Sequence, residues 1–117
     1  MRVSPYFCIL NYLYMKLINV VLIDVTNKTV TDVTIENKLE AYYEKIGCDL
    51  VEHVHIDRNI DMYVDEEGLF KDKPFFTIKS STPLRGNGLI IGTDFETGET
   101  TSSKLKADQI RPFVRFL

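Results

Sequence analysis

Two histidines form the pattern with the clearest chemical meaning in this sequence. His53 and His55 are separated by one residue, so on a strand both imidazoles point to the same face. Two imidazoles on one face can hold a metal ion when a neighbouring strand supplies a third ligand, for which the candidates are Asp57, Asp61 and Asp65. Histidines on half-exposed strands are common, so the pattern favours surface side chains. A metal site at His53 and His55 stays as an alternative, and no cofactor is predicted.

A run of acids, Asp65 to Glu67, comes directly before Gly68. Neighbouring carboxylates can act as general acid and base, or they can bind magnesium. Consecutive residues of a strand point to opposite faces, however, so these carboxylates would converge only at a bulge. We therefore predict the end of a strand that could also serve as a recognition surface. The predicted acidic surface consists of Asp61, Asp65, Glu66, Glu67 and Asp72.

The second polar candidate is the loop around Arg85 and Asn87. Its glycines read GxGxxxG and come before a strand-like run, whereas a dinucleotide fingerprint has GxGxxG before a helix. An arginine and an amide could still hold a phosphate or a base next to an aromatic ring such as Phe75 or Phe76. An exposed polar turn over a hydrophobic core is the favoured alternative. The predicted ligand-binding residues are Arg58, Tyr63, Phe76, Arg85, Asn87 and Arg111.

Length and composition indicate one globular domain. The chain has 117 residues, of which 44% are hydrophobic and 26% charged, which is enough for one core. Its net charge of -3 argues against direct nucleic-acid binding, because contacts to phosphates need clustered lysine and arginine. Cys8 and Cys48 lie far apart and lack a CxxC partner, so we predict free thiols in a reducing compartment.

The first residues are apolar but do not predict export or membrane insertion. Residues 6–15 are strongly apolar, yet Asn11 interrupts the run and no small-residue cleavage site follows. Lys16 keeps the stretch too short for a clean membrane span. We predict an N-terminal extension at residues 1–14 and a single domain at residues 15–117, with a homo-oligomer left open.

Short strand-like runs make up most of the remaining chain. Residues 16–25 are β-branched and almost continuously apolar, as in a central strand that is covered on both faces. A turn then leads to an alternating run at residues 29–35, which predicts a hairpin. Residues 49–56 and 60–64 predict a second hairpin, and residues 88–92 predict another buried strand.

Two helices are also predicted. The first covers residues 38–46, with Asn37 as its cap and Gly47 as its end. The second covers residues 104–111 and has a serine just before it as a cap. Residues 69–78 should form an irregular connection or a short helical turn with buried phenylalanines. The predicted fold class is α+β, a small mixed or antiparallel β-sheet packed with one central helix and a short C-terminal helix.

The order of these segments resembles a known family. The matching stretches are MKLINVVLIDV, TIENKLEAYYEKIG, DLVEHVHI, MYVDEEGLFKDKP, GLIIGTDFETGE and Asp108 to Ile110. Together they resemble the family of domain of unknown function 3846 over about residues 15–111, and DEEG at Asp65 to Gly68 is the most specific part. Cys48-Asp49 stands where the family tends to have a second glycine, and Phe75-Phe76 where it tends to have an asparagine. The resemblance implies a small accessory protein of bacteriophages and mobile elements in the bacterial cytoplasm.

Three classes of function follow as expectations. The first is a non-enzymatic accessory protein that acts by binding and counters host defence, either by sequestering a nucleotide signal or by blocking a host defence protein. The second is an acidic protein-protein inhibitor or nucleic-acid mimic. The third is a metal-dependent enzyme built on His53 and His55. The expected partners are a host defence protein or a small nucleotide ligand, with no nucleic acid and no membrane.

Overall fold

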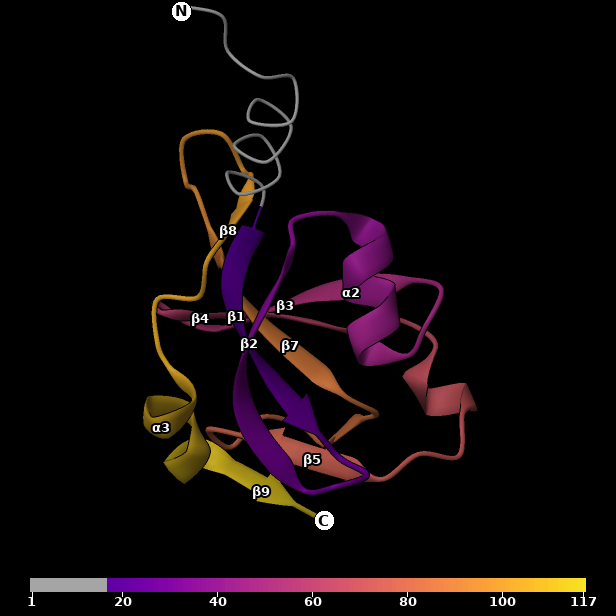
Figure 1. Ribbon diagram of the computed structural model, residues 1–117. Helices are drawn as coiled ribbons and strands as arrows, with labels where there is room; N and C mark the ends of the chain where they lie inside the picture. Colours follow the sequence, from indigo (N-terminus) through magenta and orange to yellow (C-terminus); the bar gives the residue numbers. More distant parts are fainter. Residues whose placement is uncertain (1–16) are drawn as a thin grey trace, which may run out of the picture.

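The computed structural model describes residues 17–117, so the predicted extension at residues 1–14 and Cys8 lie outside the described residues. The described chain is mostly antiparallel strand, with short helical segments between strands (Figure 1). None of the helices within residues 17–117 is long and apolar enough to cross a membrane.

Within residues 17–117, six strands form a large sheet in which every pairing is antiparallel. The strand order is β2-β1-β7-β4-β3, and β8 pairs with the end of β7. β1 pairs with β2, and β3 pairs with β4, which confirms both predicted hairpins. The strands are β1 (Leu17–Asp24), β2 (Thr29–Glu36), β3 (Val51–Asp57), β4 (Ile60–Asp65), β7 (Gly88–Thr93) and β8 (Thr100–Thr101).

A smaller sheet lies against one face of the large sheet. It has the order β6-β5-β9, again antiparallel, and consists of β5 (Phe75–Ile78), β6 (Leu84–Arg85) and β9 (Val114–Phe116). The prediction for residues 69–78 is right for the 3-10 turn η1 (Gly68–Phe70) but wrong for β5, which is a regular strand. Sequence analysis did not predict β5 and β9, because each is short and the two pair with each other from distant parts of the chain.

The helix α2 (Leu39–Ile46) confirms the first predicted helix. Gly47 ends it with a φ of 81°, in the left-handed region that glycine adopts without strain. The predicted cap is wrong, because Lys38 occupies the N-cap and makes no side-chain cap hydrogen bond. The Nδ2 of Asn37 instead donates a hydrogen bond of 2.7 Å to the carbonyl of Thr100, so Asn37 ties the start of the helix to β8.

The second helix is shorter than predicted. α3 covers Ala107–Ile110 and continues into the 3-10 turn η2 (Arg111–Phe113). The predicted serine cap is wrong, because the Oε1 of Gln109 accepts a hydrogen bond of 2.9 Å from the backbone N–H of Lys106.

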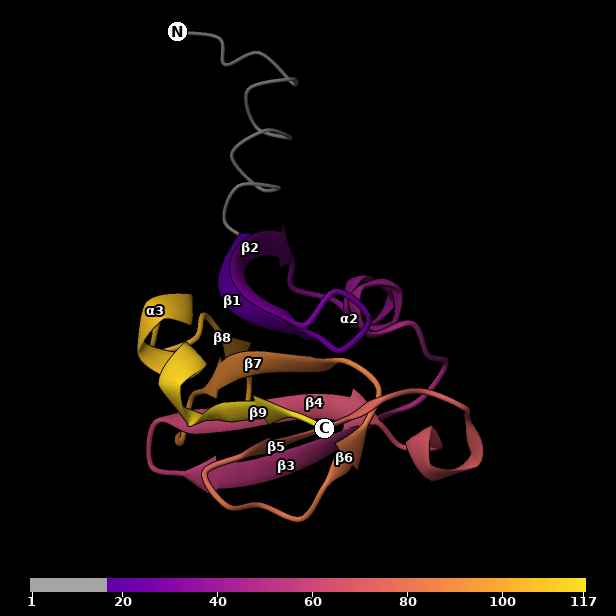
Figure 2. The same ribbon diagram turned by 90° about the horizontal axis from the view of Figure 1, so that it is seen from below.

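The large sheet separates two hydrophobic cores (Figure 2). On one face, residues such as Met62 and Ile90 pack with the small sheet and α3. On the other face, Leu89 and Ile91 pack with α2, together with the buried free thiol of Cys48. The helix α2 is therefore an outer layer on one face, and its predicted central position is wrong.

Candidate functional site

The predicted ligand-binding residues do not gather in one pocket. Arg58 is exposed in the turn between β3 and β4, and Phe76 is 0% exposed in the core, so it cannot stack beneath a bound base. Tyr63 packs on Tyr42 at 5.0 Å between ring centroids. Arg111 lies in η2 and donates a hydrogen bond of 2.7 Å to the carbonyl of Val30. The structure therefore does not bring these predicted residues together, and their role in binding a ligand stays a prediction.

Arg85 and Asn87 mainly hold neighbouring backbone in place. The guanidinium of Arg85 stacks over the ring of Phe75 at 4.2 Å, and its NH1 donates to the carbonyl of Lys71 at 2.8 Å. Among the described residues, the buried Nε of Arg85 has no hydrogen-bond partner. The Oδ1 of Asn87 accepts a hydrogen bond of 2.9 Å from the N–H of Val25.

The two histidines meet a single carboxylate. The Oδ1 of Asp61 lies 2.7 Å from the Nδ1 of His55 and 3.5 Å from the Nε2 of His53. Burial raises the pKa of Asp61, but hydrogen bonds from His55 and Thr93 and the nearby His53 outweigh burial, so this pKa lies below its ordinary range. Asp57 pairs with Lys79 instead. Within residues 17–117, no group of three His, Cys, Asp or Glu side chains is arranged to hold a metal ion.

The predicted acidic surface is smaller than expected. Asp61 and Asp65 are 7% and 9% exposed, so their place in that surface is wrong, whereas Glu66, Glu67 and Asp72 are exposed. Sequence alternation does not show which acids of β4 are covered, because the cover comes from other segments. These two carboxylates act inside the fold.

Asp65 anchors the loop that follows β4. Its Oδ2 lies 2.7 Å from the Nζ of Lys71, and its Oδ1 accepts a hydrogen bond of 2.9 Å from the N–H of Glu67. The hydrogen bond to Asp65 also raises the pKa of Lys71, which keeps this ammonium charged. The specific DEEG stretch thus begins with a structural acid.

Gly68 allows this loop to pack closely against β6. A Cβ at Gly68 would lie 2.7 Å from the carbonyl oxygen of Arg85, which is too close for any other residue without a shift of backbone. Arg85 in turn bonds the carbonyl of Lys71. Asp65, Gly68 and Arg85 therefore fix the backbone of the loop from three sides.

The fixed loop presents two large apolar side chains to solvent. Leu69 is 72% exposed and Phe70 is 88% exposed, and we call them the exposed apolar pair. Sequence reasoning missed them as functional residues. The signal was present, because an apolar pair between DEEG and KDK is unusual in a loop that is otherwise charged.

A groove of about 330 Å³, which we call the Arg85 groove, adjoins the exposed apolar pair. It lies between the β3–β4 hairpin and the strand β6, both of which contribute lining residues. Its charged lining is mainly acidic, and Arg85 is already bound to backbone. The lining includes Glu52, Val54, Glu66, Leu69, Pro83 and Leu84.

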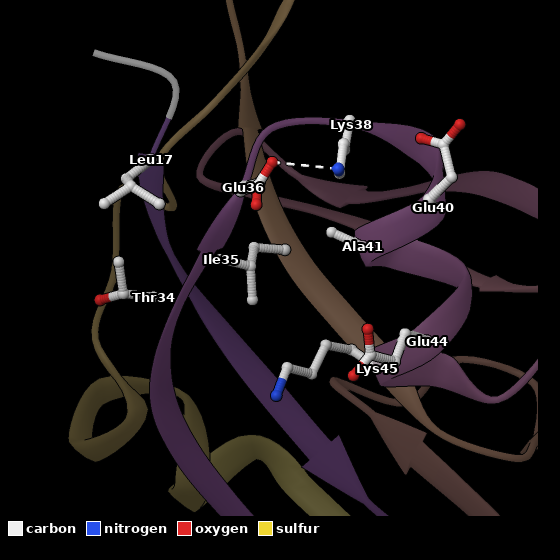
Figure 3. A pocket seen from close by; sticks show the side chains of 9 residues that line it. All are labelled: Leu17, Thr34, Ile35, Glu36, Lys38, Glu40, Ala41, Glu44 and Lys45. Atoms are coloured by element: carbon white, nitrogen blue, oxygen red, sulfur yellow. Dashed lines mark ion pairs between the residues drawn. The ribbon is translucent and has the colours of Figure 1, made fainter. Parts of the chain in front are cut away.

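A larger groove of about 440 Å³ lies between β2 and α2 (Figure 3). Ile35 and Ala41 contribute its apolar surface, and Glu36 forms an ion pair of 3.1 Å with Lys38 across its upper part. Its lining mixes acidic and basic side chains without a cluster of one sign. This groove therefore offers no chemistry that singles out a ligand.

Comparison with known proteins gives a family without an assigned activity. No curated protein and no solved structure matches the chain. The sequence model of a family described as domain of unknown function 3846 matches residues 15–114.

Proposed function

We propose that this chain, which belongs to the family of domain of unknown function 3846, acts by binding a partner protein and not by catalysis. The partner in this proposal is a host defence protein, which the chain would block during infection by a bacteriophage or transfer of a mobile element. The proposal depends on the exposed apolar pair.

An exposed pair of apolar side chains on a fixed backbone favours a binding role. Leaving Leu69 and Phe70 in water forgoes the stabilisation that burial of large apolar side chains gives, about 1.5–3 kcal/mol for each. The backbone beneath them is fixed by Asp65, Gly68 and Arg85, so docking would order few further degrees of freedom. Apolar anchors on a rigid support are typical of the centres of protein interfaces.

The charges around the exposed apolar pair suit a partner with basic residues. Glu66, Glu67 and Asp72 are exposed on the same loop together with one exposed base, Lys73, whereas Lys71 is paired with Asp65. This surface is apolar at its centre and mainly acidic at its rim, with three exposed acids against one exposed base, as expected for an inhibitor of a protein with a basic rim. The mixture fits a protein partner better than mimicry of nucleic acid, which needs a continuous acidic face.

The test is capture of partner proteins from a bacterial host lysate with the double variant Leu69→Ser and Phe70→Ser. We expect this variant to lose most of the captured protein while its melting temperature stays within a few degrees of the parent, because exposed positions contribute little to stability. The matched control is Phe95→Ser, since Phe95 is 75% exposed on another loop. Equal loss with both variants, or no loss with the double variant, would contradict the proposal.

A nucleotide ligand is the second candidate, and one observation favours it. The guanidinium of Arg85 lies over the ring of Phe75, and its buried Nε has no partner among the described residues, so this guanidinium is the candidate donor to a phosphate. Thermal melts with a panel of cyclic and linear nucleotides test this candidate, because a ligand that binds only the folded state raises the melting temperature. No rise at millimolar nucleotide would remove it.

A further inference from the structure

We propose that the partner binds as an extended strand that adds to the free edge of β3, with alternate side chains in the Arg85 groove. This inference rests on the proposed function, because it names how a partner protein is held. Leu69 belongs to both the exposed apolar pair and the lining of the groove, so the test of strand addition acts on the backbone of β3 at His53, which is part of neither.

The edge of β3 has unused backbone groups. β3 is the last strand in the order of the large sheet, and within residues 17–117 it pairs with β4 alone. The carbonyl of Leu50 accepts a hydrogen bond of 3.1 Å from the N–H of Glu66, so the even-numbered residues of β3 bond to β4. The backbone N–H and C=O groups of Val51, His53 and His55 therefore point away from the sheet.

The opposite edge of the large sheet is partly occupied. At β2, the NH2 of Arg111 donates a hydrogen bond of 2.7 Å to the carbonyl of Val30. The carboxylate of Asp32 accepts a hydrogen bond of 2.9 Å from the N–H of Ala107. α3 and η2 thus cover the part of that edge around Val30 and Asp32, whereas β3 pairs with β4 alone within residues 17–117.

β3 also lacks two of the features that protect an edge from pairing. Natural edge strands often carry lysine or proline, and β3 has neither in the sequence VEHVHID. Its register is irregular between His55 and Asp57, at the end of the strand, so the stretch before the irregularity is regular.

The Arg85 groove defines the chemistry of the incoming strand. Val54 of β3 and Leu84 of β6 offer apolar contacts, while Glu52 and Glu66 place negative charge at one end. The side chains that face the groove should therefore be aliphatic with a lysine or arginine next to Glu52. Those on the other face lie beside the exposed His53 and His55, so they should be polar.

A second copy of this chain fits the same edge less well. In a pairing of β3 with another β3, the residues facing the groove would be Glu52, Val54 and Ile56 of the copy. These include an acid and no base, so Glu52 of the copy would enter a groove that is already acidic. The charge of the groove thus selects a strand from a basic partner.

The experiment compares His53→Pro with His53→Ala in the whole chain. Both variants lose the imidazole, but only proline removes the outward N–H, and proline is tolerated on edge strands where the N–H faces solvent. The probe is a blocked synthetic peptide in which threonine alternates with lysine, valine and leucine, measured by fluorescence anisotropy. We expect His53→Ala to keep the affinity within about threefold and His53→Pro to weaken it by about tenfold or more.

Controls keep the test decisive. A peptide of the same sequence with methylated backbone nitrogens should bind at least about tenfold more weakly, because it cannot complete the ladder. If His53→Pro does not fold, amide exchange in the unaltered protein replaces it, and the N–H groups of Val51, His53 and His55 should exchange more slowly when the unmethylated peptide is bound.

Several results would overturn strand addition. They are equal affinities of the proline and alanine variants, equal binding of the methylated peptide, or unchanged amide exchange at the edge. A concentration-dependent dimer of the protein alone that His53→Pro abolishes would assign the edge to a second copy. Partner capture that needs Leu69 and Phe70 but is unaffected by His53→Pro would overturn strand addition and leave the proposed function standing.

Discussion

At the scale of single residues, Asp61 is a buried carboxylate whose pKa is lowered by its neighbours in the fold. It lies on β4 with 10% of its side chain exposed, and it bonds His55 on the neighbouring strand. The pKa of Asp61 is lowered, because the hydrogen bonds and the adjacent imidazoles favour the charged form more than burial disfavours it. Asp61 therefore stabilises the hairpin β3–β4 only while it is ionised.

A pH prediction follows from the sign of this shift. Because the pKa of Asp61 in the folded state lies below that of an unfolded aspartate, about 3.9, its contribution is present above pH 4 and is lost as the pH falls through the folded value. We expect Asp61→Asn to lower the free energy of unfolding at pH 7 by about 1 kcal/mol. We also expect the free energy of unfolding, measured by urea unfolding, to fall less steeply below pH 4 in Asp61→Asn than in the parent.

Asp57→Asn is the matched comparison for Asp61→Asn. The pKa of Asp57 is also lowered, mainly by the hydrogen bond from Lys79, but this ion pair is open to solvent. Exposed pairs contribute little, so Asp57→Asn should flatten the pH dependence less than Asp61→Asn does. If Asp57→Asn flattens the pH dependence of the free energy of unfolding more than Asp61→Asn does, the role given to Asp61 is contradicted.

At the scale of elements, the strand β7 needs a glycine at its first position. A Cβ at Gly88 would lie 2.8 Å from the Cζ of Phe76 and 2.9 Å from the Sδ of Met62. We expect Gly88→Ala to destabilise the fold by about 1–3 kcal/mol, because the contact overpacks the core between the two sheets. Adding Phe76→Leu should recover part of this loss, since the pair is in direct contact.

Urea unfolding of the single and double variants measures this coupling. The control combines Gly88→Ala with Ile78→Val, because Ile78 lies in the same core but is not among the nearest neighbours of Gly88. The two effects of the control pair should add within about 0.5 kcal/mol. If the effects add in both pairs, the contact between Gly88 and Phe76 is not the cause of the destabilisation by Gly88→Ala.

The elements also show what sequence could and could not predict. Both hairpins of the large sheet were predictable, because their turns and alternating side chains are local signals. The strands β5 and β9 were not, since the pairing of Phe76 with Phe116 joins short segments from distant parts of the chain. The helix α2 was predictable from its periodicity, but its place on one face of the sheet was not.

The candidate site was less predictable than the fold. Sequence analysis selected the DEEG stretch but assigned Asp65 to the surface, because only tertiary contact with Lys71 shows that it is buried. It also placed Phe76 beneath a ligand, whereas the alternation of β5 turns Phe76 into the core. The exposure of Leu69 and Phe70 is evident only in the structure, although an apolar pair within a charged loop was a signal in the sequence.

At the scale of the whole molecule, the C-terminal strand closes the core and lies apart from the proposed binding surface. Val114 and Phe116 of β9 pack against the core between the sheets and pair with β5. Removing residues 114–117 would uncover Phe76 and Ile78, which are fully buried. We expect this truncation to lower the free energy of unfolding by about 3 kcal/mol or more, at about 25 cal/mol per Å² of apolar surface exposed.

The same truncation tests whether closing the core and binding a partner are separable. The exposed apolar pair and the edge of β3 make no strand pairing with β9, which pairs with β5. Partner capture well below the melting temperature should therefore persist in the truncated chain, while urea unfolding shows the loss of stability. Leu117→Ala is the control, because the side chain of Leu117 is exposed and the substitution keeps its backbone hydrogen bond to the carbonyl of Phe75, so neither measurement should change appreciably. A truncated chain as stable as the parent would contradict the closing role of β9, and loss of capture by a chain that is still folded would show that the binding surface depends on this strand.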